Sequence, residues 1–351
     1  MIDWRLATLV AQGVASLGPP VPEAAAAPFE ALGDAEAESR RLVEAYTSLT
    51  PLAPVPAAEP VDRAAWIETA LAGMRGLLEP VVERIGTDLG PVGMPLRAAG
   101  GAVLALEVGA ISGILAQRVL GQYEFSVLDP AAPARLLFVT PNLAHAAGKL
   151  EASPGDLLRW VSLHEVTHAL QFGGVPWLRA DLADRVRNLL AALEMKVDGR
   201  RLKKMPSVTD LRGIVEAFKA GELATLALGE GQRAQLESMQ AFMALLEGYA
   251  EHVMDVVGAE LLPDLPGLRA AMDRRRHERT GMLRLLEKLI GLDMKMRQYE
   301  LGKAFCDAVV AHGGIGRLNR VWEAPERVPT PAELVDPAAW IARTEPTELV
   351  A

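Results

Sequence analysis

The sequence predicts a mainly α-helical protein that also contains a small β-sheet or hairpin. Alanine, leucine and glycine dominate the 351 residues, and aromatic residues make up only 5%, which favours helices over an all-β fold. Apolar residues recur at helical spacing through most of the chain, with proline-rich breaks between the helical stretches. The stretch from residue 122 to residue 143 instead has the branched and aromatic residues that are typical of strands.

The composition is that of a folded globular protein, with 50% apolar and 23% charged residues. A net charge of −9 argues against a nucleic-acid partner, which would require a basic face. The single cysteine, Cys306, excludes an internal disulfide, and its apolar helical surroundings favour a core position. The first residues lack the basic region of a signal peptide, so we expect a cytoplasmic protein.

The N-terminal part is expected to be helical, with helices over 34–49 and 62–86 and a proline-rich loop at 51–62 between them. A third helix, over residues 98–117, consists largely of alanine and glycine and has the length of a membrane span. Glu107 in its middle would cost about 2.5–3.5 kcal/mol in a bilayer. We therefore expect a buried helix whose small residues allow close packing, and a membrane-associated protease is the weaker alternative.

The next elements are two strands and the helix that carries the chemistry. The segments QYEFSVLDP (122–130) and ARLLFVTPNL (134–143) are predicted to be paired strands. A helix over 154–172 follows, because Ser153 suits the N-cap, Pro154 the first turn, and Gly173 and Gly174 its end.

The C-terminal half returns to helices. These are predicted over 181–204, with a basic end, over 233–260 and over 283–312, followed by a tail of short turns. We predict an N-terminal helical region, 1–120, packed on a catalytic region, 121–351, in one compact unit. Nothing in the sequence indicates the oligomeric state.

The segment SLHEVTHALQF, on the predicted helix over 154–172, has the spacing of a metal site. On a helix, His164 and His168 project from one face one turn apart, so both imidazoles can reach a single ion. Glu165 lies beside that face, where its carboxylate can hold the metal-bound water and take its proton. Two neutral imidazoles and one carboxylate suit Zn²⁺, which lowers the pKa of bound water and polarises a carbonyl group.

A third ligand must come from another part of the chain, because Gln171 does not fit a compact motif with a third histidine. The segment MALLEGYAEHVMD (243–255) offers two glutamates one turn apart, Glu247 and Glu251. We favour Glu247 and retain Glu251 as the alternative. Asp255, a further turn along, and Glu251 are also candidates to hydrogen-bond a ligand histidine.

HEVTH followed by EGYAE resembles the glutamate-ligand zincin metallopeptidases. DWRLA, RLLFVTPNL, WVSLHEVTHALQFGGVPWLR, LLEGYAEHVMDVVG, MRQYELGKAF and RVPTPAEL extend the resemblance, over nearly the whole chain, to a bacterial family. That family is described as zinc-dependent metalloproteases or as hydrolases associated with deazaflavin-coenzyme biosynthesis. The resemblance implies a zincin-like fold, zinc bound by His164, His168 and Glu247, and Glu165 as general base. It supplies no substrate, and the sequence has no glycine loop suited to holding that coenzyme's phosphate.

Two departures from the zincin pattern bear on the third ligand. Leu246 stands where many glutamate zincins have asparagine, and Glu247 follows His168 by 79 positions (247 − 168), a longer interval than in common members. In zincins an edge strand beside the active-site helix binds extended substrate, so the resemblance points to ARLLFVTPNL for that role. A peptidase also needs a donor for the developing oxyanion, and the candidates are Tyr249, His252, His277 and Tyr299.

The sequence therefore predicts a zinc-dependent metallohydrolase, most simply a peptidase, in which Glu165 deprotonates a zinc-bound water. Its expected partner is a peptide or protein substrate. The alternative is a metal-binding zincin-fold protein that acts as a binding or assembly factor without turnover, since Glu165 would be present in both cases.

Overall fold

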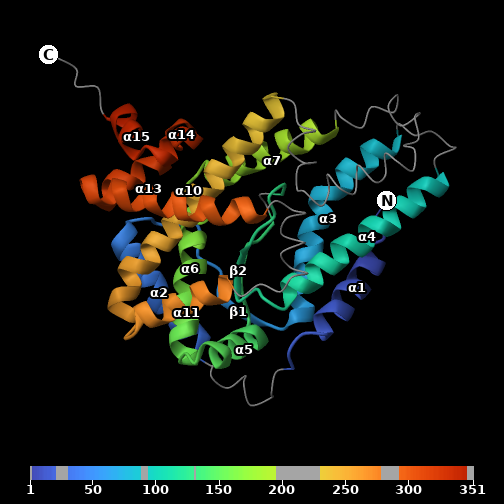
Figure 1. Cartoon of the computed structure of the whole chain (residues 1–351), viewed down its shortest axis with the longest axis horizontal. Helices are drawn as coiled ribbons and strands as arrows, with labels where there is room; N and C mark the ends of the chain where they lie inside the picture. Colours follow the sequence, from blue (N-terminus) through green and yellow to red (C-terminus); the bar gives the residue numbers. More distant parts are fainter. Residues whose placement is uncertain are drawn as a thin grey trace. The chain divides into compact units, whose positions relative to one another are not determined.

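The computed structural model describes residues 2–20, 31–87, 94–129, 132–194, 230–277 and 292–345. Helices make up most of these ranges, together with one three-stranded sheet (Figure 1). The predicted fold class, mainly α with a small sheet, is therefore confirmed. The basic segment at 199–205 and the start of the helix predicted over 283–312 lie outside the described residues.

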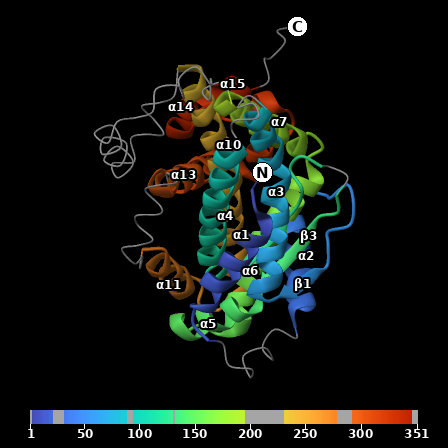
Figure 2. The same ribbon diagram turned by 90° about the vertical axis from the view of Figure 1, so that its right-hand side faces the viewer.

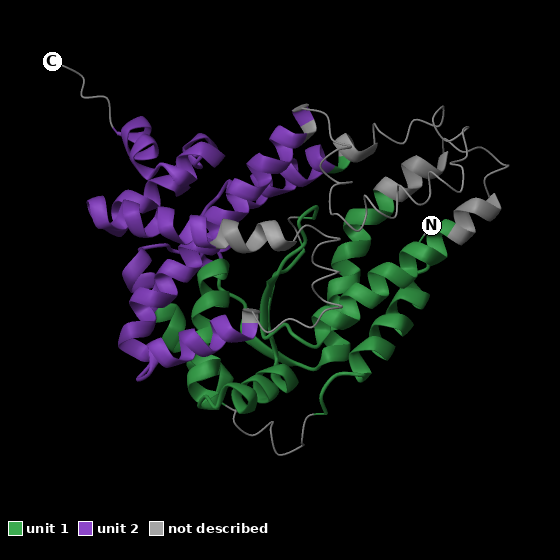
Figure 3. Ribbon diagram, in the orientation of Figure 1, with its two compact units in different colours: residues 1–41, 54–169, 190–203 green, residues 42–53, 170–189, 204–351 purple. Residues whose placement is uncertain are grey.

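The chain divides into two compact units, each built from three stretches of sequence (Figure 3). Unit 1 consists of Met1–Arg41, Pro54–Ala169 and Leu190–Lys203; unit 2 consists of Leu42–Ala53, Leu170–Leu189 and Lys204–Ala351. The chain passes from one unit to the other within α2 (Leu32–Thr47), α6 (Pro154–Gly174) and α7 (Leu178–Glu194).

The sheet belongs to unit 1, and its strand order is β1-β3-β2. The strands β2 (Gly121–Glu124) and β3 (Arg135–Val139) are paired, as the sequence predicts, and the pair is antiparallel; both strands are shorter than expected. The strand β1 (Ala58–Val61) pairs with β3 in parallel and lies in the segment predicted to be a loop. The prolines in this segment led to the prediction of a loop, but proline is tolerated on a strand at the edge of a sheet, which is where β1 lies.

The structure corrects the expectation that ARLLFVTPNL forms the edge strand. Within the described residues β3 is the central strand, paired on both sides, and β2 is an edge strand. All of Leu136–Val139 are buried, which suits a central strand covered on both faces. The strand is also shorter than predicted, because the chain enters helix α5 (Thr140–Leu150) directly after Val139, with Pro141 in its first turn.

Three long helices complete the main body of unit 1: α1 (Trp4–Ser16), α3 (Arg63–Thr87) and α4 (Met94–Ala116). α3 packs Trp66, Ile67 and Leu71 into a core cluster that includes two residues of β3, Leu137 and Val139. Burial of such side chains contributes roughly 1.5–3 kcal/mol each, so this cluster fixes the sheet against α3.

The small-residue helix α4 lies alongside α1, as Figures 1 and 2 both show. A Cβ atom at Gly109 would meet the backbone of Ala7, and one at Gly113 would meet the backbone of Ala11. The expected close packing through small residues is therefore confirmed. The helix is not buried as a whole, however, because Val103, Leu104 and Leu106 are exposed on the side away from these contacts. No helix in the part of the chain that the structure describes combines the length and apolar character needed to span a bilayer.

Unit 2 is organised around the contact between α10 (Glu230–Leu261) and α13 (Leu292–Leu318). A Cβ at Gly248 of α10 would overlap the backbone at Gly302 of α13, and one at Gly302 would overlap the backbone of Ala244. The two helices therefore touch backbone to backbone. α13 is interrupted at Gly314, whose positive φ of 74° is a conformation that glycine adopts at little cost.

Shorter elements complete unit 2. They are α11 (Leu265–His277), the 3₁₀ turns η4 (Asn319–Trp322) and η5 (Pro325–Arg327), and the helices α14 (Pro331–Val335) and α15 (Pro337–Thr344). Cys306 on α13 is fully buried, and burial raises the pKa of its thiol, in agreement with the expected core position.

Candidate metal centre

The helix α6 holds His164, Glu165 and His168 within a largely buried scaffold. Ser153 precedes the helix, and its Oγ accepts from the backbone N–H of Asp156 at 3.4 Å. The apolar side chains of the helix are buried, among them Leu157, Leu158, Val161, Leu163, Val166, Ala169 and Leu170. Both histidines remain partly exposed.

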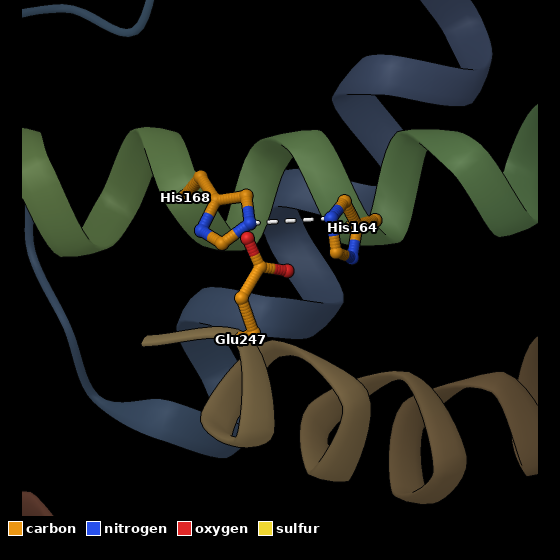
Figure 4. A group of neighbouring side chains, drawn as sticks. All are labelled: His164, His168 and Glu247. Carbon is orange, nitrogen blue, oxygen red and sulfur yellow. Dashed lines mark hydrogen bonds between the residues drawn. The ribbon is translucent and has the colours of Figure 1, made fainter. Parts of the chain in front are cut away.

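The two imidazoles are arranged as two ligands of one ion would be. His164 Nε2 and His168 Nε2 lie 3.2 Å apart, and the ring planes are inclined at 86° (Figure 4). Two nitrogens bound to one tetrahedral Zn²⁺ at 2.0–2.1 Å are separated by about 3.3 Å. The spacing predicted from an α-helix therefore yields a nitrogen pair of the right separation for zinc.

A carboxylate from α10 completes the group. His164, His168 and Glu247 each offer a ligand atom, and these atoms all lie within 4.8 Å of one another. Figure 4 shows the Glu247 carboxylate directed at the imidazoles. All three side chains are partly exposed, which gives water and substrate access to an ion held there. Two nitrogens and one oxygen are a donor set that zinc accepts, so the residues present fit the metal.

Gln171 links α6 to α10 next to Glu247, a role that was not predicted from the sequence. Its side chain is fully buried, and its Nε2 donates to the carbonyl oxygen of Leu246 at 3.2 Å. Gln171 follows His168 by three residues on the same helix, and Leu246 directly precedes Glu247. The position of Gln171 on the histidine face, at i+7 from His164, is the sequence signal that could have identified it.

Glu165 is buried, with 7% of its surface exposed, and the edge strand β2 holds its carboxylate. The backbone N–H of Tyr123 donates to Glu165 Oε2 at 2.8 Å. Glu165 lies next to His164 in sequence but does not belong to the group of three ligand residues.

The other two candidate acids of α10, Glu251 and Asp255, form ion pairs. Arg269 of α11 donates to Glu251 Oε2 at 2.7 Å, and it also pairs with Asp255. Lys303 Nζ of α13 lies 2.9 Å from Asp255 Oδ2. The carboxylate that the structure brings to the histidines is therefore that of Glu247, whereas Glu251 and Asp255 meet cations of neighbouring helices.

Two of the four candidate oxyanion donors are buried in unit 2 and form hydrogen bonds with other side chains. Tyr249 is fully buried, donates to Asn319 Oδ1 at 2.8 Å, and has its pKa raised by burial. His252 is buried between Tyr46 Oη, 2.7 Å from its Nε2, and Asp307 Oδ1, 2.7 Å from its Nδ1. The side chains of His277 and Tyr299 lie outside the described part of the chain.

Comparisons with known proteins cover nearly the whole chain. A family model described as zincin-like metallopeptidase matches residues 2–341. The crystal structure of "a putative hydrolase with a novel fold" from Chloroflexus aurantiacus is 31% identical in sequence, with a TM-score of 0.71. The match covers 99% of this chain and 100% of that one. No curated protein matches the chain.

Proposed function

Because the chain belongs to the zincin-like metallopeptidase family, we propose that it is a zinc-dependent peptidase with His164, His168 and Glu247 as metal ligands and Glu165 as general base. The family implies a metal, typically zinc. The observation that carries the proposal is the convergence of two imidazoles and one carboxylate, from helices far apart in sequence, on positions within 4.8 Å of one another.

The chemistry follows from the groups around Glu165. Zinc, when bound, acts as a Lewis acid that polarises a carbonyl group and makes water more acidic. Glu165 takes the proton from the attacking water and passes it to the nitrogen of the leaving amine. The proton moves at Oε1, because Oε2 is bonded to the backbone N–H of Tyr123.

The proposed substrate is a peptide or protein, and the proposed location is the cytoplasm. A net charge of −9 and the partly exposed ligand residues suit a protein that takes up a polypeptide rather than nucleic acid. The single, buried cysteine is compatible with a reducing compartment.

The experiment that tests the proposal compares wild-type protein with the Glu165→Gln variant on a broad peptide library, with and without a zinc chelator. We expect cleavage that the chelator abolishes, and a loss of about 100-fold or more in kcat in the variant, since general-base catalysis contributes about 10²–10⁴-fold. Zinc content should be unchanged.

Glu260→Gln is the matched control, because Glu260 is an exposed glutamate on α10. It should retain full activity. Normal turnover in Glu165→Gln would refute the assigned base. Absence of any cleavage by zinc-loaded wild-type protein would favour a binding or assembly role without turnover.

A further inference from the structure

The edge strand β2 makes a direct contact with the proposed general base. Glu165 Oε2 accepts a hydrogen bond from the backbone N–H of Tyr123 at 2.8 Å, and the Glu165 side chain is buried. A carboxylate taken out of water needs such a donor, because an unpaired buried charge is costly. Glu165 thus obtains a partner from a main-chain group, whose position no side-chain rotation can change.

The pairing of β2 with β3 explains why this N–H is directed at Glu165. Val139 N donates to Leu120 O, so these two residues form a hydrogen-bonded pair of the antiparallel ladder. Hydrogen-bonded and non-hydrogen-bonded pairs alternate along such a ladder. Gly121 and Tyr123, opposite Phe138 and Leu136, are therefore non-hydrogen-bonded pairs, and their backbone groups point away from β3.

Gly121 gives Glu165 the space to approach the strand. A Cβ atom at this position would lie 2.7 Å from Glu165 Cγ and 3.0 Å from Glu165 Oε1. It would also lie 2.8 Å from Val161 Cγ1, one helical turn earlier on α6. Real Cβ atoms do not come this close, so any larger residue at 121 must push Glu165, Val161 or the strand itself.

We propose that the backbone of β2 at Gly121 and Tyr123 positions the carboxylate of Glu165 for hydrolysis. The Tyr123 N–H holds Oε2, so the carboxylate presents Oε1 to the water and to the leaving amine. This inference rests on the proposed function for the role of Glu165, although the contact itself does not depend on turnover. Gly121 and Tyr123 act through Glu165 and are positioning residues.

The arrangement also constrains substrate binding along this edge. A peptide that adds to β2 as a further strand would need the outward-pointing main-chain groups of β2, and the Tyr123 N–H is already bonded to Glu165. The substrate must therefore pair with β2 through other groups or displace Glu165 from this donor. A substrate that displaced Glu165 would disturb the general base, so we expect productive binding when the substrate pairs with other groups of β2.

The first test is the Gly121→Ala variant. Zinc content and KM should stay within about twofold of wild type, whereas kcat should fall by about tenfold or more, because a displaced base affects the proton transfer alone. Gly148→Ala is the matched control, since a Cβ at Gly148 meets nothing within 4 Å. An unchanged kcat in Gly121→Ala would overturn the proposal.

The second test needs no activity, so its result is separable from a failure of the proposed function. Amide hydrogen exchange at Tyr123 should be about tenfold faster or more in Glu165→Ala than in wild type, because a charge-assisted hydrogen bond is lost. Glu165→Gln should restore the protection, since its amide oxygen can accept the same bond, while hydrolysis stays lost. Equal exchange rates in wild type and Glu165→Ala would refute the contact even if the protein is an active peptidase.

Discussion

The helices α6 and α10 supply the candidate ligands, but they hold them in place by different means. In α6, His164 and His168 are set 3.2 Å apart by a single turn of one continuous helix. In α10, the position of Glu247 depends on tertiary packing: its neighbour Gly248 touches the backbone of α13 at Gly302, and Leu246 accepts from Gln171.

This difference identifies the vulnerable part of the centre. A helical turn keeps its geometry under most surface substitutions, whereas a backbone-to-backbone crossing is disturbed by a single methyl group. Substitutions far from the ligands should therefore weaken metal binding when they alter the packing of α10, and rarely when they alter the surface of α6.

The largest expected effect is that of removing the α10 carboxylate. Glu247→Ala should weaken zinc binding by about 100-fold or more, because loss even of groups that only hold a ligand costs about 10–100-fold. Competition with a chromophoric chelator measures the affinity. Glu251→Ala is the control: it removes the partner of Arg269 and should weaken binding less. A larger loss in Glu251→Ala than in Glu247→Ala would reverse the assignment of the third ligand.

A smaller effect is expected from the crossing of α10 and α13. Gly302→Ala should lower the zinc affinity about tenfold and destabilise the zinc-free protein by about 1–3 kcal/mol, since its Cβ would overlap the backbone of Ala244. Helix propensity alone would favour alanine by about 1 kcal/mol, so a loss must come from the crossing. Zinc titration and thermal unfolding measure the two quantities.

The matched control lies on α13 beyond its interruption at Gly314. A Cβ at Gly316 meets nothing within 4 Å, so Gly316→Ala should bind zinc like wild type. If Gly302→Ala and Gly316→Ala bound zinc equally well, the position of Glu247 would not depend on the α10–α13 contact.

The smallest effect concerns an ionic contact of the same helix pair. Burial opposes ionisation of Asp307, but hydrogen bonds from Lys303 and His252 outweigh burial and lower the pKa of its carboxyl group. A lowered pKa contributes stability above the usual aspartate range, and that stability is lost as the pH falls through the lowered value. Asp307 is partly exposed, so the contribution is at most about 1 kcal/mol.

Asp307→Asn should therefore lower the free energy of unfolding at pH 7 by at most about 1 kcal/mol, and the difference from wild type should shrink below about pH 4. Urea unfolding of the zinc-free proteins at both pH values measures it, and the zinc affinity at pH 7 should not change. A difference that grew on acidification would contradict the assigned direction of the pKa shift.

Sequence patterns predicted the features that depend on local spacing. The capped helix with HEVTH, the small-residue helix and the paired strands β2 and β3 each have a periodicity or a boundary signal that is visible within about 20 residues. Glu247 could be proposed because a carboxylate on an apolar helix stands out, and because EGYAE resembles the zincin pattern.

The features that the sequence did not predict depend on contacts between distant segments. The strand β1 is too short and too rich in proline to be predicted from its own residues, and only its pairing with β3 defines it as a strand. Because β1 was not predicted, β3 was not expected to be the central strand. Gln171 lies on the histidine face of its helix, but its partner, the Leu246 carbonyl group, is far away in the sequence. Gly302 has ordinary local surroundings, and its role appears only once α10 lies against α13.

The presence of a zinc centre is tested by the metal content of wild type and His168→Ala, both isolated without chelators. We expect one zinc per chain in wild type and loss of that zinc in His168→Ala, while His312→Ala, which removes an exposed histidine of α13, keeps it. Wild-type protein without zinc, or His168→Ala that retains a full equivalent, would contradict a centre built from α6 and α10.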